Sequence, residues 1–293
     1  MSTISEDELR ASGFLKDAYT RERMYEGITP YHGTNRSGMN APKNPQRTPW
    51  KIGVELEVIA KDSGKYDELR VRPSNWFFRE TDSSLCSSYG IEFITIPLSP
   101  RDAKSVAFWR DFCDFVATRA NSWRCETCGL HVHISREIFD RDGVEANKGK
   151  INAQTLWALA MEGTETAYKI YGRRRTYSQM TIGGDYADAA KTLGLECLRV
   201  KSVADRVKGE TTTRKRYAQV NIAPEKTIEF RLGKGSICAR RIAAVCEASE
   251  LFCLWSKITP IYRATEENFV GFMRRKMQRS GGLAQIIGNA EEN

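Results

Sequence analysis

Apolar residues recur at helical spacing in four stretches of this chain. A helix is indicated where apolar residues follow one another at intervals of three and four positions. Ser99-Pro100 gives the first stretch a suitable start, and Gly172 closes the second. We therefore predict helices over residues 100–120, 152–171, 236–255 and 265–279.

Four shorter segments alternate apolar and polar residues, which is the pattern of a strand with one buried face. They lie at residues 53–58, 90–95, 129–135 and 227–232. Alternate side chains of a strand point to opposite faces, so the aliphatic residues and phenylalanines of each segment mostly share one face. The opposite face receives Glu55, Glu57, Glu92, His131, His133, Ser135, Thr227, Glu229 and Arg231.

These polar residues predict a metal site if the four segments belong to one sheet. Several carboxylates cannot crowd together at neutral pH unless cations neutralise them. Oxygen-rich clusters with an occasional imidazole suit Mg²⁺ or Mn²⁺, and such ions commonly accompany a nucleotide triphosphate. The alternative is four unrelated strands with solvated polar faces. Two of the chain's three histidines fall within the pattern, which favours the metal site.

Composition and charge indicate a folded protein with phosphate-bearing partners. The 293 residues are 41% hydrophobic, which is enough for a core. Forty-five Lys and Arg against 37 Asp and Glu give a net charge of +8, which favours a nucleotide, a nucleic acid or an acidic metabolite. We find no apolar run that could span a bilayer and no secretory signal, so we expect a cytoplasmic protein with reduced cysteines and no membrane partner.

The strand segments belong to longer motifs that occur in a fixed order. The motifs are GVELEV at 53–58, TDSSL at 81–85 with GIEFITIPL at 90–98, CGLHVHIS at 128–135 and RYAQVNIAPEKTIEFRL at 216–232. In this order they resemble the amidoligase family of carboxylate–amine ligases, relatives of glutamine synthetase and glutamate–cysteine ligase. The resemblance covers roughly residues 50–235.

The resemblance implies an α+β fold, with a curved, mainly antiparallel sheet that carries the active site on one face and helices on the other. We expect a catalytic domain at 46–260, an irregular arm at 1–45 and a helical tail at 261–293. The resemblance also implies ATP, two or more Mg²⁺ ions and formation of an amide or peptide bond. A substrate carboxylate would attack the γ-phosphate to give an acyl phosphate, from which an amine would displace phosphate.

Six residues are the metal ligands that the resemblance implies. The ligands of one metal group are Glu57, Asp82 and Glu92. The ligands of the ion nearest the γ-phosphate are Glu55, His131 and Glu229. Family members often carry Asp-Gly-Ser-Leu where this chain has Asp82-Ser83-Ser84-Leu85, so the turn that presents Asp82 differs.

The other implied site residues bind the nucleotide or the transferred phosphoryl group. Arg231 and Arg216 are the cations that stabilise that group. The implied nucleotide contacts are His133, Ser135, Arg174, Arg175 and Tyr177. The last three belong to a basic segment that looks like the family's segment near the substrate site. Its alternative interpretation is a solvated helix end, where basic residues are favourable.

Cys125 and Cys128 offer a different metal site. With His131 and His133 they supply four ligands of the kinds that zinc prefers. A single Cys-x-x-Cys is common, however, and two buried thiols are the simpler interpretation.

Other functions fit parts of the sequence. Basic stretches at 173–175, 206–216 and 274–279 favour nucleic-acid binding, but no helix-turn-helix, zinc-finger or aromatic RNA-binding motif accompanies them. A family member without catalysis, acting as a structural or interaction protein, and a phosphotransferase are further alternatives. The expected partners of a ligase are carboxylate and amine substrates, from small molecules to peptides or proteins. The arm or the tail could also recruit an oligomer.

Overall fold

The fold is taken from a computed structural model, which describes residues 27–28, 36–37, 50–71, 77–80, 85, 88–173, 218–279 and 281–288. Its main sheet has the strand order β4-β5-β3-β7-β9-β8, and β6 pairs with the end of β3. The strands are β3 (Ile52–Ala60), β4 (Phe77–Glu80), β5 (Gly90–Thr95), β6 (Ala120–Asn121), β7 (Gly129–Ser135), β8 (Val220–Asn221) and β9 (Thr227–Lys234). Within the predicted arm, β1 (Gly27–Ile28) pairs with β2 (Arg36–Ser37).

Neighbouring strands of the main sheet are antiparallel throughout. The predicted α+β class with a mainly antiparallel sheet is therefore confirmed. The four segments that alternate in the sequence are β3, β5, β7 and β9, and they are neighbours in one sheet. Their apolar side chains, among them Val54, Val132 and Phe230, are buried in the core.

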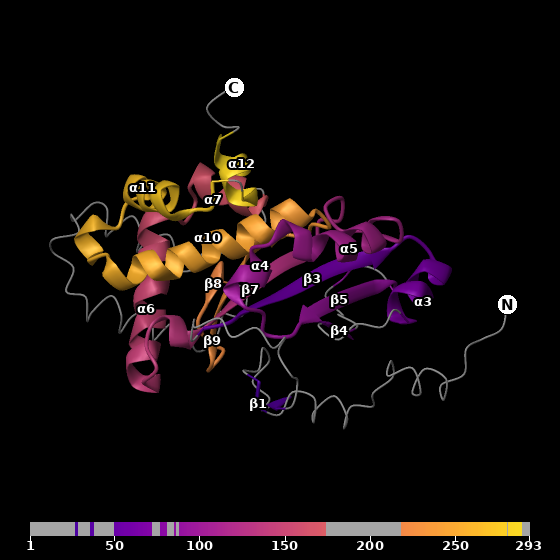
Figure 1. Ribbon diagram of the computed structural model, residues 1–293, viewed down its shortest axis with the longest axis horizontal. Helices are drawn as coiled ribbons and strands as arrows, with labels where there is room; N and C mark the ends of the chain where they lie inside the picture. Colours follow the sequence, from indigo (N-terminus) through magenta and orange to yellow (C-terminus); the bar gives the residue numbers. More distant parts are fainter. Residues whose placement is uncertain are drawn as a thin grey trace.

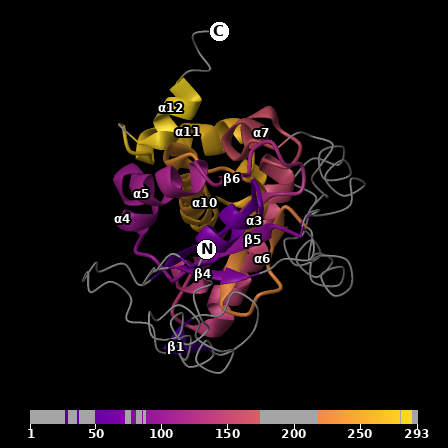
Figure 2. The same ribbon diagram turned by 90° about the vertical axis from the view of Figure 1, so that its right-hand side faces the viewer.

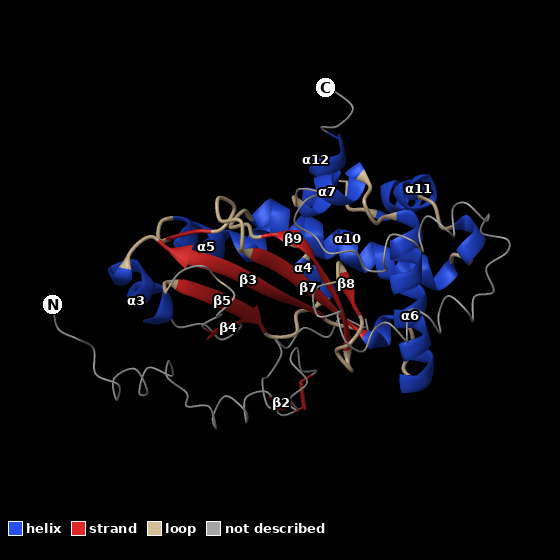
Figure 3. Cartoon of the chain, turned by 180° about the vertical axis from the view of Figure 1, so that it is seen from behind, coloured by secondary structure: helices blue, strands red, loops and turns tan. Residues whose placement is uncertain are grey.

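Helices form a layer beside the sheet (Figures 1 and 2), and Figure 3 shows the same layers from behind. Helices α4, α5 and α10 lie along the sheet, and α10 contacts β7 as well as α4, α5, α6, α7, α11 and α12. The helices are α3 (Ser63–Val71), α4 (Pro100–Ala103), α5 (Val106–Ala117), α6 (Gly143–Ala160), α7 (Glu165–Tyr171), α10 (Ala239–Ile258), α11 (Glu266–Lys276) and α12 (Gly282–Gly288). None of these described helices is long and apolar enough to cross a membrane.

The single helix predicted at 100–120 is wrong, because the chain forms α4 and α5 there. Ser99 caps α4 by accepting a hydrogen bond from the backbone N–H of Asp102. Ser105 then caps α5 by accepting one from Phe108. A second serine cap within the stretch ends the first helix and starts the next.

The helix predicted at 152–171 begins earlier, at Gly143, and is also two helices. The chain turns at Gly163, whose φ of +76° lies in the left-handed region that glycine adopts readily. Thr164 caps the second helix, α7. Gly172 closes α7 as predicted, with a φ of +78°.

The helices predicted at 236–255 and 265–279 are confirmed as α10 and α11, with shifted ends. Helices α3 and α12 lie outside all predicted helices. Helix α11 belongs to the predicted C-terminal tail, yet Phe269, Phe272 and Met273 are buried in the common core. The tail is thus packed onto α10 as far as the structure describes it.

Aromatic rings join the sheet to three helices. Phe252 of α10 is fully buried, and its ring centroid lies 5.0 Å from Trp157 of α6 and 5.1 Å from Phe269 of α11. The ring of Phe230 on β9 lies 6.1 Å away. Most of these contacts are edge-to-face, the arrangement that aromatic quadrupoles favour.

Phe252→Ala should lower the free energy of unfolding by about 3–5 kcal/mol, because it leaves a cavity where three elements meet. Chemical denaturation followed by circular dichroism measures the change. Phe108→Ala on α5 is the matched control, since Phe108 is only partly buried beside the core and should cost clearly less. Equal losses in the two variants would contradict a central role for Phe252.

Candidate metal centre

The pairing of four strands brings the predicted acidic and imidazole residues together. Residues directly opposite each other in an antiparallel pair project from the same face. The opposed pairs are Glu55–His131, Glu57–Glu92 and His133–Glu229. One face of the sheet therefore collects six ionisable residues, as the alternation predicts.

This face is not a solvated surface. The six residues are buried, with exposed fractions between 1% for Glu55 and 7% for Glu92. Burial of a carboxylate is expensive unless it is paired with a cation or bound to a metal. The interpretation of four independent solvated strands is therefore wrong for these residues.

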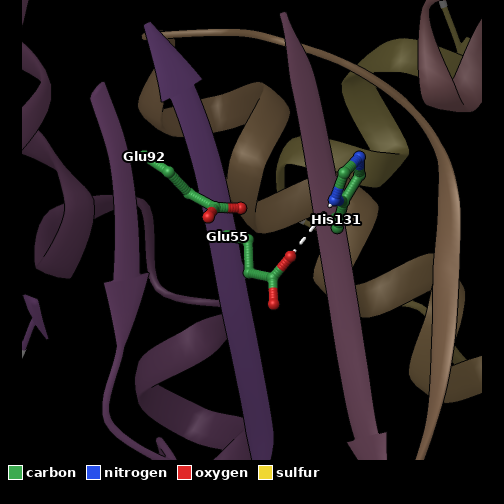
Figure 4. Close-up of side chains that lie close together, drawn as sticks. All are labelled: Glu55, Glu92 and His131. Atoms are coloured by element: carbon green, nitrogen blue, oxygen red, sulfur yellow. Dashed lines mark hydrogen bonds and ion pairs between the residues drawn. The ribbon is translucent and has the colours of Figure 1, made fainter. Parts of the chain in front are cut away.

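Glu55 lies at the centre of the cluster. Its Oε2 is 3.2 Å from Nδ1 of His131, and its Oε1 is 3.0 Å from Nε2 of His133. Figure 4 shows Glu92, Glu55 and His131 extending toward one another from β5, β3 and β7, with the contact between Glu55 and His131 dashed. A single carboxylate thus contacts both imidazoles.

Two overlapping sets of side chains are arranged as metal ligands. Glu55, Glu92 and His131 form one set, and Glu55, His133 and Glu229 form the other, with ligand atoms in each set within 4.8 Å of one another. Relative to the expected groups, His133 joins Glu55 and Glu229, and His131 joins Glu92. His131 nevertheless remains near the expected group, with Nδ1 3.8 Å from Oε1 of Glu229.

Glu229 is held by two donors. Asn221 Nδ2 donates a hydrogen bond to Oε2 at 2.7 Å, and Arg231 donates one to Oε1. Burial lowers the pKa of Arg231, but the carboxylates of Glu229, Glu55 and Glu57 outweigh this effect and raise it above its ordinary value. The guanidinium therefore stays charged within an electronegative site. Arg231 was predicted as a site residue, whereas Asn221 was not.

Glu57 is fixed by the backbone of Gly129 on β7 and by the side chain of Ser122. The N–H of Gly129 donates to its side-chain Oε2, and Ser122 Oγ donates to its main-chain carbonyl at 2.7 Å. Its Oε1 lies 3.9 Å from Nε2 of His131. Glu57 thus faces the cluster, although it belongs to neither set of ligands.

The absence of a side chain at Gly129 leaves room for the side chains of His131 and Arg173. A Cβ at this position would overlap Nε2 of His131 and would lie 3.2 Å from Nη2 of Arg173. Arg173 is buried, and it donates to the carbonyls of Gly233 and Glu126, each at 3.2 Å. The guanidinium of Arg173 therefore lies beside His131, which the sequence did not predict.

The strand that carries Glu229 and Arg231 is irregular beside His131. The register of β7 and β9 shifts there, so that two residues of β9, Arg231 and Leu232, lie opposite the single residue His131 of β7. A Cβ at Gly233 would overlap the carbonyl oxygen of Leu130, so only glycine fits the closely spaced backbone at this bulge. Bulges redirect side chains, and this one lies at the edge of the cluster.

The remaining predicted site residues are Ser135, which binds the backbone of a neighbouring segment, and five residues that lie outside the described part of the chain. Ser135 is buried, and its Oγ accepts a hydrogen bond from the backbone N–H of Lys51 at 2.9 Å. The predicted residues that lie outside the described part of the chain are Asp82, Arg174, Arg175, Tyr177 and Arg216.

The cysteine pair does not join the histidines. Sγ of Cys125 lies 3.1 Å from Oγ1 of Thr127, and Cys128 is buried and forms no disulfide. Among the described residues, neither set of metal-ligand atoms includes a cysteine. The structure therefore favours two thiols over a zinc site.

No protein-family model matches this sequence, and no curated protein matches it.

Gly129→Ala should lower the free energy of unfolding by about 1–3 kcal/mol, the usual cost of forcing extra volume into a packed site. The new methyl group must displace His131 or Arg173. Gly271→Ala on α11 is the matched control, because a Cβ there meets only the end of the Arg275 side chain at 3.5 Å. That control should be neutral or stabilising, and an equally mild Gly129→Ala would contradict the packing described.

Glu57→Gln should raise the free energy of unfolding in EDTA by about 1 kcal/mol, because it removes one of two like charges that face each other in the sheet. The amide oxygen still accepts from Gly129, so the fold is retained. Denaturation without divalent ions measures the change, with the exposed Glu267→Gln as the control. A loss of stability specific to Glu57→Gln would contradict this and would show that the attraction between Glu57 and Arg231 outweighs the repulsion from Glu92.

Proposed function

We propose that the chain is an amidoligase, an ATP- and Mg²⁺-dependent ligase that joins a carboxylate to an amine through an acyl phosphate. The observation that carries the proposal is the buried cluster of four glutamates and two histidines on one face of an antiparallel sheet. The order of the four sequence motifs that contain these residues supports it independently.

The donor set fits hard divalent cations. Carboxylate oxygens outnumber imidazole nitrogens in the cluster, and oxygen ligands with an occasional imidazole suit Mg²⁺ and Mn²⁺. Glu55, Glu92 and His131 would hold one ion, and Glu55, His133 and Glu229 a second. Bound ions of this kind neutralise charge on the phosphates during phosphoryl transfer.

The chain's own residues supply position and charge. Asn221 and Arg231 fix the carboxylate of Glu229, and Gly129 fixes that of Glu57. Arg231 carries a positive charge that stabilises negative charge on a transferred phosphoryl group. Because acyl phosphates react with amines directly, the reaction needs no serine or cysteine nucleophile, and positioning accounts for most of the protein's contribution.

Glu55→Gln should weaken Mg²⁺-dependent binding of a non-hydrolysable ATP analogue by about 100-fold, or about 2.7 kcal/mol. The reason is that Glu55 belongs to both ligand sets, and its amide counterpart lacks the charge. Calorimetry with and without Mg²⁺ on wild type and variant measures the effect. Glu267→Gln on α11 is the control and should bind as wild type does.

Binding that depends on Mg²⁺ in wild type and is lost in Glu55→Gln justifies assays of acid–amine pairs for ADP and phosphate release. Product formation that requires the amine separates a ligase from a phosphotransferase. Absence of analogue binding under every metal condition would overturn the proposal. Salt-dependent binding of DNA or RNA without ATP would then favour the nucleic-acid alternative.

A further inference from the structure

A concave site lies apart from the metal ligands. A cavity of about 820 Å³ opens between α7, the start of α10 and α12. Its volume lies in the range of small-molecule sites, about 300–1,000 Å³. None of the six clustered glutamates and histidines lines it. The cavity therefore needs an explanation of its own.

The described lining of this cavity is strongly basic. Lys169, Arg240 and Arg241 contribute to the wall, and no aspartate or glutamate does so among the described residues. Lys169 is paired with Glu165 at 3.4 Å, so Arg240 and Arg241 carry the charge that an anion in the cavity would offset. The lining thus selects for negative charge.

Backbone carbonyls of the described residues hold Arg241 in place through only one of its three side-chain nitrogens. Its Nη1 donates to the carbonyls of Lys169 and Ile170 at 2.6 and 2.9 Å. Within the described part of the chain, Nε and Nη2 have no hydrogen-bond acceptor. Burial lowers the pKa of this guanidinium below its ordinary value, as expected where a cation loses water without gaining a carboxylate. A preorganised guanidinium of this kind suits phosphate oxygens.

An aromatic wall completes the cavity. Trp123 is 43% exposed, although it is one of the largest side chains of the protein. Its ring rests on Gly172, where a Cβ would lie 2.8 Å from ring carbons. Nζ of Lys234 lies 4.7 Å from the ring centroid and Cζ of Arg241 lies 5.5 Å from it, so the indole also helps to position Arg241. Tyr168 and Ile286 also contribute to the lining. The wall offers apolar and planar contact beside the cations.

We propose that this cavity binds a small phosphate monoester attached to a planar ring, the chemistry of a mononucleotide. Arg240 and Arg241 would bind the phosphate. Trp123, with Tyr168 and Ile286, would contact the planar ring. This site is separate from the metal centre and does not depend on the ligase proposal. Two lining residues are chain neighbours of residues at that centre: Trp123 follows Ser122, which donates to the carbonyl of Glu57, and Gly172 precedes Arg173, which lies beside His131.

Calorimetry in EDTA tests the site with AMP as the probe, and with adenosine and inorganic phosphate as the separate parts of AMP. We expect AMP to bind wild type and Glu55→Gln equally, and each part to bind more weakly than AMP. Arg240→Gln should weaken AMP binding about tenfold or more, while Arg275→Gln on α11, also an exposed arginine, should not.

Cys238 supplies a second readout that needs no substitution. This thiol is exposed and lines the cavity, so bound AMP should slow its alkylation by about tenfold at ten times Kd. Cys125, outside the lining, should react at an unchanged rate.

Three results would overturn the proposal. The first is no AMP binding in EDTA, and the second is an equal loss in Arg240→Gln and Arg275→Gln, which indicates non-specific attraction. The third is AMP binding that is lost in Glu55→Gln with Cys238 unprotected, which places AMP at the metal centre. Because all measurements exclude divalent ions, failure of the Mg²⁺–ATP proposal leaves their outcome unaffected.

Discussion

The negative charge buried on one face of the sheet is the constraint on which the rest of the site depends. Glu55 contacts both imidazoles, Glu57 faces Glu92, and Glu229 is held by an arginine and an asparagine. Glu55, Glu57 and Glu229 thus each have a neighbour that orients them, which for Glu57 is the N–H of Gly129. Arg231 and Arg173 are the guanidinium groups beside the four glutamates, and the divalent cations proposed above would supply further positive charge.

The same strand geometry produces the core and the cluster. Every second residue of β3 and β7 enters the apolar layer against the helices, and the residues between them project into the cluster. The aromatic contacts of Phe252 and Trp157 hold that layer in place. Because register decides which side chains share a face, a rigid core keeps six ionisable groups within reach of one another.

The local sequence pattern predicts which side chains of a strand share a face, but not which strand lies beside it or in which register. The alternation in β3, β5, β7 and β9 correctly assigns polar side chains to one face, whereas the pairing of Glu57 with Glu92 requires the register. Arg173 was missed because its role comes from the end of α7, which brings it beside Gly129 across 44 positions of sequence. The caps Ser105 and Thr164 and the turn at Gly163 interrupt two predicted helices and are present in the sequence, but apolar periodicity alone does not detect them. The basic cavity joins three helices and has no local signature.

A cluster of this kind is poor evidence for stability and good evidence for function. Apolar side chains of similar volume would fill the same face without the penalty of removing charge from water. Natural proteins tolerate such penalties chiefly where a ligand or a reaction requires them. Gly129 and Gly233 support the same conclusion, because a Cβ at the first would overlap His131 of the cluster and a Cβ at the second would overlap the carbonyl of Leu130 beside it. The fold thus gives up stability at the place where a cation, and the anion it attracts, would restore it.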